Sequence, residues 1–226
     1  MTLEEFSQVF ARIRSLGFVP SKRKGATGVG YTLERLLNLS ENNIALSDLS
    51  EAELKAHRIG SSSMITLFTF NRKAWKMNPL EAIRKYGTPD ENGRLGLYFT
   101  MSPTPNSAGL FLHFVSDAAQ VRHISGTLIA EWKIDEVARQ FERKIPKMIL
   151  VSAFSEMRGE TEWFHYVRAQ LLSGTSANIL EQQIKEGNVL IDLRLHDAGT
   201  RARNHGTGFR AKEEKLPMLF REVREI

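Results

Sequence analysis

Residues 148–154, MILVSAF, form a nearly continuous apolar run that lacks the alternation of a half-buried strand. Such a run is typical of a central strand that is buried on both faces of a sheet. The patterns around it alternate between helical and strand-like spacing. The sequence therefore predicts an α/β fold with a mixed central sheet flanked by helices.

Signals for the other elements are spread along the whole chain. Thr2-Leu3-Glu4-Glu5 forms a capping box that opens a first helix, and Asn78 followed by Pro79 begins another. Further helices are expected over 31–39, 134–141, 162–172 and 177–185, and around Leu219, Phe220 and Val223. Strands are expected over 44–46, 51–56, 64–70, 95–100, 110–115, 127–132 and 189–193. A polar loop is expected over 196–208.

Basic residues outnumber acidic ones, with 31 Lys and Arg against 26 Asp and Glu, for a net charge of +5. This excess permits an anionic partner, but it is equally compatible with an ordinary basic protein. The distribution is more informative, because residues 6–33 and 199–212 contain no acid. These stretches predict two contact patches for a polyanion, formed by Arg12, Arg14, Lys22, Arg23 and Lys24 and by Arg201, Arg203, Arg210 and Lys212.

The absence of cysteine excludes disulfides, thiolate zinc sites and a cysteine nucleophile. The first ten residues carry early acids and do not form a signal peptide. No run approaches the roughly 18 apolar residues of a membrane span. We therefore expect a cytoplasmic protein with no membrane partner.

The segment DLSEAELK, from Asp48 to Lys55, combines residues suited to phosphodiester hydrolysis. Side chains of a strand alternate between faces, so Glu53 and Lys55 share one face. Asp48 and Glu53 are expected to meet across a turn and to hold Mg²⁺, which prefers one or two carboxylates. Lys55 would then orient the attacking water and neutralise charge on the phosphate. The alternative is an exposed strand that carries a surface ion pair.

The acid-x-Lys spacing alone is not specific, because it recurs at Glu131-Lys133, Glu142-Lys144 and Glu213-Lys215. The last two copies lie at or near predicted helices, where residues i and i+2 do not share a face. The copy at Glu131 has no acid shortly upstream. The pair at Glu53 alone combines a strand, an upstream acid and a preceding glycine-rich basic loop.

Glu34, on the short predicted helix before the strands, is a further candidate for the metal site, or else a solvated helix residue. The glycine-rich loop before it follows no strand and is a poor dinucleotide fingerprint. Its backbone is better suited to approach a DNA phosphate, together with Lys22, Arg23 and Lys24. The chain contains no P-loop, no HExxH and no GxSxG motif.

At these residues the sequence resembles the MvaI/BcnI family of restriction endonucleases, members of the PD-(D/E)xK superfamily. The matching runs keep their order along most of the chain: GVGYTLE (28–34), ENNI (41–44), DLSEAELK (48–55), TLF (66–68), EWFHY (162–166), GNVLIDL (187–193) and NHGTGFR (204–210). The mismatch-repair nickase MutH is a more distant relative, sharing the helical acid and the Glu-Leu-Lys strand.

The resemblance implies a restriction-endonuclease-like core with a DNA cleft between two lobes. We place the mainly catalytic lobe at about 1–115 and the mainly DNA-recognising lobe at about 116–226, with strands returning to the core. It implies a monomer that cuts short double-stranded DNA sites one strand at a time with Mg²⁺, for which Mn²⁺ can substitute. A cognate DNA methyltransferase would be a genetic partner. Asp48, Glu53 and Lys55 match the family's catalytic triad, and Glu34 matches its helical acid.

The resemblance also implies that the C-terminal loop reads bases, through Arg203, Asn204, His205 and Arg210. Arg201 and Lys212 are expected to contact phosphates instead, which position the protein on DNA without reading its sequence. The alternative is an ordinary turn with solvated arginines. Some relatives carry a base-contacting histidine where this chain has Thr69, so the recognised sequence stays open.

Three rival functions remain at this point. The first is a MutH-like repair nickase, which would accumulate open-circular plasmid. The second is a catalytically inactive DNA-binding module, and the third is a metabolic α/β enzyme without salt-sensitive DNA affinity.

Overall fold

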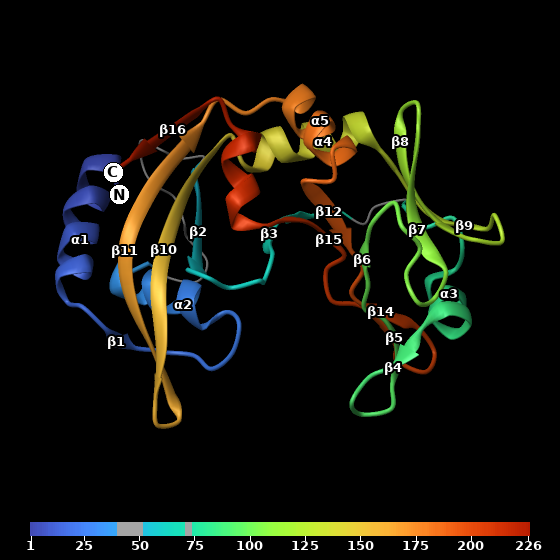
Figure 1. Ribbon diagram of the computed structural model, residues 1–226, viewed down its shortest axis with the longest axis horizontal. Helices are drawn as coiled ribbons and strands as arrows, with labels where there is room; N and C mark the ends of the chain where they lie inside the picture. The colour runs from blue at the N-terminus through green and yellow to red at the C-terminus, as the bar shows by residue number, and fades with distance from the viewer. Residues whose placement is uncertain (40–51, 71–73) are drawn as a thin grey trace. The chain divides into compact units, whose positions relative to one another are not determined.

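The computed structural model describes residues 1–39, 52–70 and 74–226 (Figure 1). The chain folds into two compact units, each assembled from separate stretches. Unit 1 comprises residues 1–65, 144–175 and 216–226, and unit 2 comprises 66–143 and 176–215. The chain therefore passes between the units several times. The assignment of catalysis and recognition to separate lobes stays a prediction.

Unit 1 is built on a five-stranded mixed sheet with the order β1-β11-β10-β2, and β16 also pairs with β11. Strand β2 runs parallel to β10, whereas the pairings of β11 with β1, β10 and β16 are antiparallel. The strands are β1 (Val19–Pro20), β2 (Ala52–Arg58), β10 (Lys147–Arg158), β11 (Thr161–Ser173) and β16 (Glu222–Glu225). The predicted mixed central sheet is confirmed.

The central position of β10 follows from its apolar run. Its residues from Met148 to Ala153 are each at most 1% exposed, so both faces of this part of the strand are covered. Phe154, the last residue of the predicted run, is 50% exposed. The prediction of a strand buried on both faces is therefore confirmed up to Ala153.

Two predicted helices are wrong. Residues 162–172 belong to strand β11, because aromatic and β-branched residues there alternate in burial and pair with β10 around a turn at Gly159 (φ +61°). At the C-terminal end, a 3₁₀ helix η1 (Glu213–Leu219) contains Pro217 and is followed by strand β16. Proline disrupts an α-helix interior, which explains the short 3₁₀ segment.

Two helices cover one face of the unit 1 sheet. They are α1 (Leu3–Ser15), which begins with the predicted capping box at Thr2, and α2 (Gly28–Leu36). The residues of this core share an apolar character and near-complete burial: Phe6, Phe10, Ile13, Val29, Leu33, Leu37, Ala52, Ile149, Val151, Ala153 and Phe164 among others. We call the face of β2 that carries Ala52, Leu54 and Ala56 the core face, because all three pack into this cluster.

Tyr166 of β11 fastens α2 to the sheet. Its hydroxyl donates a hydrogen bond of 2.7 Å to the carbonyl oxygen of Val29, inside the core. Burial raises the pKa of Tyr166 above its ordinary value, so the hydroxyl keeps the proton that it donates.

Unit 2 contains three smaller sheets. The first has the order β3-β15-β12-β6, the second β14-β13-β5-β4 and the third β7-β8-β9. The strands are β3 (Ile65–Thr69), β4 (Thr88–Pro89), β5 (Leu95–Leu97), β6 (Thr100–Met101), β7 (Leu110–Val115), β8 (Ala118–His123), β9 (Leu128–Lys133), β12 (Val189–Asp192), β13 (Leu195–Asp197), β14 (Ala202–Asn204) and β15 (Gly208–Ala211). The predicted polar loop at 196–208 is thus partly a hairpin.

The remaining helices are α3 (Pro79–Tyr86), α4 (Ile134–Lys144) and α5 (Ala177–Lys185). Asn78 caps α3 through its side chain, and Ser176 caps α5. Within the described part of the chain, no helix is both long and apolar enough to cross a lipid bilayer.

Substituting Gly28 at the start of α2 by alanine should destabilise the protein. A Cβ there would lie 2.4 Å from the carbonyl oxygen of Arg23 and 2.9 Å from Oγ of Ser21. Helix propensity favours alanine by about 1 kcal/mol, but we expect the clash to outweigh it and to cost about 1–3 kcal/mol in urea unfolding.

Gly30→Ala in the same helix is the matched control, because its Cβ would meet no atom within 4 Å. It should be neutral or stabilising, by up to about 1 kcal/mol. Equal effects of the two substitutions would contradict the packing explanation.

Candidate active site

Glu53 and Lys55 project from the face of β2 opposite the core face. This follows from the alternation of the strand, because Ala52, Leu54 and Ala56 pack into the core. The Nζ atom of Lys55 lies 2.5 Å from Oε1 of Glu53, and the two side chains are 24% and 37% exposed. The structure therefore brings these two predicted residues together in a pair that solvent reaches. We call this the site face of β2.

Stability alone does not explain this pair. An ion pair exposed to this degree contributes about 0–1 kcal/mol, because water screens both charges. The copy of the same spacing on β9 is arranged differently: Lys133 pairs with Asp117 at 2.6 Å, and Glu131 pairs with Lys76 at 3.2 Å. The direct pairing of Glu53 with Lys55 thus distinguishes it from this second copy.

Asp48 lies outside the described residues. Glu34 lies on α2, the helix that packs against the core face of β2, and it is half-buried. Among the described strands, β2 pairs with β10 alone. The joint metal site of Asp48, Glu53 and Glu34 stays a prediction.

The chemistry of Glu53 suits a hard divalent cation. A half-exposed carboxylate offers the oxygen ligands that Mg²⁺ prefers, and Mg²⁺ usually keeps several waters beside one or two carboxylates. Over residues 1–39, 52–70 and 74–226, no group of three or more His, Cys, Asp or Glu side chains has the arrangement of a metal site.

A polar row next to Lys55 was not singled out from the sequence. Nε2 of His57 lies 3.0 Å from Oγ of Ser152, which also accepts a hydrogen bond of 3.4 Å from Nη2 of Arg168. His57 is 8% exposed and Ser152 is fully buried, so His57 is a strand-end residue bonded within the protein. The sequence could not predict this row, because its three members are far apart along the chain and lie on three different strands.

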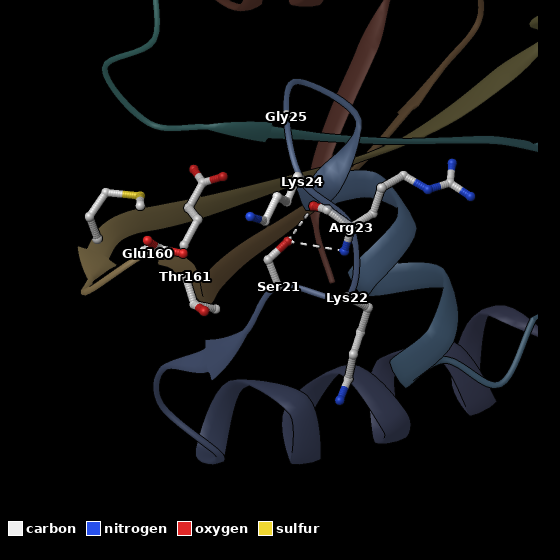
Figure 2. Close-up of a pocket in the computed structure, with 9 residues that line it drawn as sticks. Ser21, Lys22, Arg23, Lys24, Gly25, Glu160 and Thr161 are labelled. Atoms are coloured by element: carbon white, nitrogen blue, oxygen red, sulfur yellow. Dashed lines mark hydrogen bonds between the residues drawn. The ribbon is translucent and has the colours of Figure 1, made fainter.

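The predicted basic loop forms a pocket with the turn between β10 and β11. Figure 2 shows Lys22, Arg23, Lys24 and Gly25 beside Glu160 and Thr161, with the three cationic side chains pointing in different directions. The pocket has a volume of about 350 Å³. All three cationic residues are exposed, as a contact with a polyanion requires.

In unit 2, Thr69 lies beside the predicted recognition loop. Cγ2 of Thr69 lies 3.2 Å from the position where a side chain at Gly206 would begin, and the ring of Phe68 stacks on Phe209 at 5.0 Å. Thr69, which stands where some relatives carry a histidine, therefore lies against the loop that was predicted to read bases.

The side-chain oxygen of Asn204 is already hydrogen-bonded within that loop. Its Oδ1 accepts hydrogen bonds of 2.8 Å from the backbone nitrogens of both Gly206 and Thr207. Pairing with adenine would require the same oxygen, so the structure favours a turn-forming role for Asn204. Arg203 and His205 are exposed in the same segment.

A buried carboxylate, which was not singled out from the sequence, organises the arginines of this region. Asp192 is 1% exposed, and its Oδ2 lies 2.9 Å from Nε of Arg210 and 2.6 Å from Nε of Arg194. Its Oδ1 accepts a hydrogen bond of 2.9 Å from Thr100. Burial lowers the pKa of Arg210, and the charge of Asp192 counteracts this effect. One carboxylate therefore pairs with two guanidinium groups, and it accepts a hydrogen bond from that of Arg194.

Arg201 and Lys212, the predicted phosphate contacts, are exposed. Arg201 lies between β13 and β14, in a hairpin that Arg84 of α3 anchors through Asp197 at 2.8 Å and the carbonyl oxygen of Gly199 at 2.7 Å. Lys212 directly follows β15. Their exposure is compatible with phosphate contacts.

The sequence model of the MvaI/BcnI restriction endonuclease family matches residues 7–220. The chain belongs to this family. It is therefore a site-specific deoxyribonuclease, and restriction endonucleases generally use divalent metal ions. The resemblance stated from the motifs is confirmed.

Two solved structures of the restriction endonuclease MvaI are similar to this family member, each at 25% sequence identity. The MvaI complex with its cognate DNA substrate has a TM-score of 0.79 and covers 100% of this chain and 99% of the MvaI chain. MvaI in the absence of DNA has a TM-score of 0.56, with 99% and 97% covered. No curated protein sequence matches the chain.

His196 is a buried histidine that contacts the predicted recognition loop, and we expect it to make the stability of the protein sensitive to pH. Nδ1 of His196 lies 2.8 Å from Nε2 of His205 and 3.3 Å from the hydroxyl of Tyr98. Burial lowers the pKa of His196 below its ordinary value of 6.5, and the charges of His205, Arg94 and Arg203 lower it further.

The unfolded chain therefore binds more protons than the folded chain just below pH 6.5, and stability should fall as the pH drops through this window. We expect His196→Asn to reduce this fall, as measured by urea unfolding at a series of pH values. The exposed His113→Asn on β7 is the control. An unchanged pH dependence in His196→Asn would refute the assignment.

Proposed function

We propose that the chain is a type II restriction endonuclease that hydrolyses phosphodiester bonds of double-stranded DNA at a specific sequence, using Mg²⁺. The observation that carries this proposal is the Glu53–Lys55 pair on the site face of β2, in a chain of the MvaI/BcnI family. Mn²⁺ is expected to substitute for Mg²⁺. The enzyme would act as a monomer that cuts one strand at a time.

Each residue of the proposed centre has a separate task. Glu53 and Asp48 would hold the metal, with Glu34 assisting from α2. When bound, Mg²⁺ supplies positive charge against the phosphate. The ammonium of Lys55 can shift from Glu53 to the scissile phosphate, where it offsets developing negative charge and orients the attacking water.

The remaining candidates divide into two groups. Lys22, Arg23, Lys24, Arg201 and Lys212 would contact DNA phosphates, because their side chains are exposed and cationic. Arg203, His205 and Arg210 would read bases, and Arg194 joins them because Asp192 pairs with both Arg194 and Arg210. Guanidinium groups held in a fixed orientation suit bidentate recognition of guanine.

Lys55→Ala should strongly slow cutting while DNA binding persists. Losing an electrostatic contact to the reacting phosphate costs about 10²–10³-fold in rate. The measurement is plasmid cleavage with Mg²⁺ beside a DNA-binding assay. Lys133→Ala is the matched control, because Lys133 has the same acid-x-Lys spacing on a strand but pairs with Asp117.

The cleavage products discriminate among the alternatives. Linear plasmid with defined end sequences supports restriction, whereas open circles that accumulate in a methylation-dependent way support a MutH-like nickase. Wild-type protein that binds DNA but cuts none with Mg²⁺ or Mn²⁺ would be an inactive binding module, and the proposal would be wrong.

Arg210→Ala should relax the sequence preference at one base position, at a cost of about 1–3 kcal/mol for that base. The measurement is cleavage of a library of randomised target sites, compared between variant and wild type. Arg201→Ala is the control, because an exposed phosphate contact should weaken binding to all sequences equally. A uniform loss in Arg210→Ala would place Arg210 among the phosphate contacts.

A further inference from the structure

The side chain of Arg58 joins the basic loop (residues 21–25) to the strand that carries Glu53 and Lys55. Arg58 is the last residue of β2, three positions after Lys55. By the alternation of the strand it projects from the core face, opposite Lys55. Its guanidinium therefore contacts residues on the core side of the strand, opposite the proposed site.

The guanidinium of Arg58 makes four hydrogen bonds. Nε and Nη2 donate to the carboxylate of Glu162 at 2.6 and 2.8 Å. Nη1 donates to the carbonyl oxygen of Ala26 at 3.0 Å, and Nη2 donates to that of Gly25 at 3.0 Å. Four of the five N–H groups are thus engaged in a planar arrangement, which the single point charge of a lysine cannot reproduce.

The loop is also fastened along its length. The backbone nitrogen of Ser21 donates to the carbonyl oxygen of Glu162 at 2.8 Å, and that of Lys22 donates to Oγ1 of Thr32 at 2.9 Å. Oγ of Ser21 donates to the carbonyl oxygen of Arg23 at 2.7 Å. These bonds fix the first half of the loop to β11 and α2, and Arg58 fixes the end.

The charges are arranged to leave Lys22 and Lys24 of the loop exposed. Glu162 neutralises Arg58, since the two side chains are only 22% and 18% exposed and bond to each other. The carbonyl oxygens of Gly25 and Ala26 are occupied by the same guanidinium. Lys22 and Lys24 remain exposed at the pocket shown in Figure 2.

We propose that Arg58 is a positioning residue that holds the basic loop at a fixed distance from Glu53 and Lys55, so that the loop binds the DNA backbone in register with the scissile phosphate. The inference rests on the proposed function, because it assumes that the loop contacts DNA. A merely structural ion pair would contribute to stability without affecting what Lys22 and Lys24 do for binding.

A double-mutant cycle on binding tests this role. The probe is a short fluorescent duplex of arbitrary sequence, since phosphate contacts do not depend on sequence. In the wild-type background, Lys22→Ala with Lys24→Ala should weaken binding about tenfold and lower the slope of log K against log salt by about 2. In an Arg58→Ala background the same change should weaken binding less than about threefold, because the loop is no longer held in register.

Arg158→Ala is the matched control. Arg158 belongs to the same unit and pairs with Glu156 at 2.6 Å, and its guanidinium stacks on Trp163 rather than contacting the loop. The full tenfold effect should persist in that background. Should Arg58→Ala fail to fold, Arg58→Lys gives the same comparison, because it keeps the charge and loses the planar arrangement.

If Lys22→Ala with Lys24→Ala weakens binding by the same factor in the Arg58 variant as in the wild type, the effects are independent and the inference is wrong. The endonuclease proposal would not be affected by this result. Wild-type protein that binds no duplex would refute the proposed function itself. The two failures are therefore distinguishable.

Discussion

The arrangement of the unit 1 site depends on the two-sided character of one strand. Ala52, Leu54 and Ala56 of β2 pack into the core beneath α1 and α2, which places Glu53 and Lys55 on the other face. A shift of one residue would bury both charges and expose the apolar residues. The free energy of burying the core face therefore fixes the orientation of the charged pair.

The neighbours of β2 hold this register. On one side it runs parallel to β10, whose residues from Met148 to Ala153 are almost completely buried. At its end, Arg58 binds Glu162 of β11 and two carbonyl oxygens of the loop before α2. Tyr166 then ties α2 to β11 through the carbonyl oxygen of Val29. The strand, the loop and the helix are thus one hydrogen-bonded assembly around one core.

Local patterns in the sequence predicted much of this arrangement. The apolar run identified β10, the alternation around Glu53 and Lys55 placed them on one face, and the capping box located α1. Strand β11 was missed because its apolar spacing also fits a helix, and only pairing with β10 decides between them. The predicted C-terminal helix was wrong because Pro217 interrupts it.

The long-range partners could not be predicted, because residue spacing carries no information about them. Arg58 and Glu162 are 104 positions apart, and His57 and Ser152 are 95 positions apart. Asp192 resembles an ordinary strand-end acid until the fold brings Arg210 against it. Asn204 was expected from the family resemblance to read a base, whereas the turn it forms engages its oxygen.

The most direct test of the central claim is anomalous diffraction from crystals of the protein with Mn²⁺ and an uncleavable duplex. We expect a Mn²⁺ ion bound by the carboxylate of Glu53 on the site face of β2, with Asp48 as a second ligand and a DNA phosphate beside Lys55. A DNA-bound structure in which Mn²⁺ lies elsewhere and Glu53 keeps its pairing with Lys55 would contradict it.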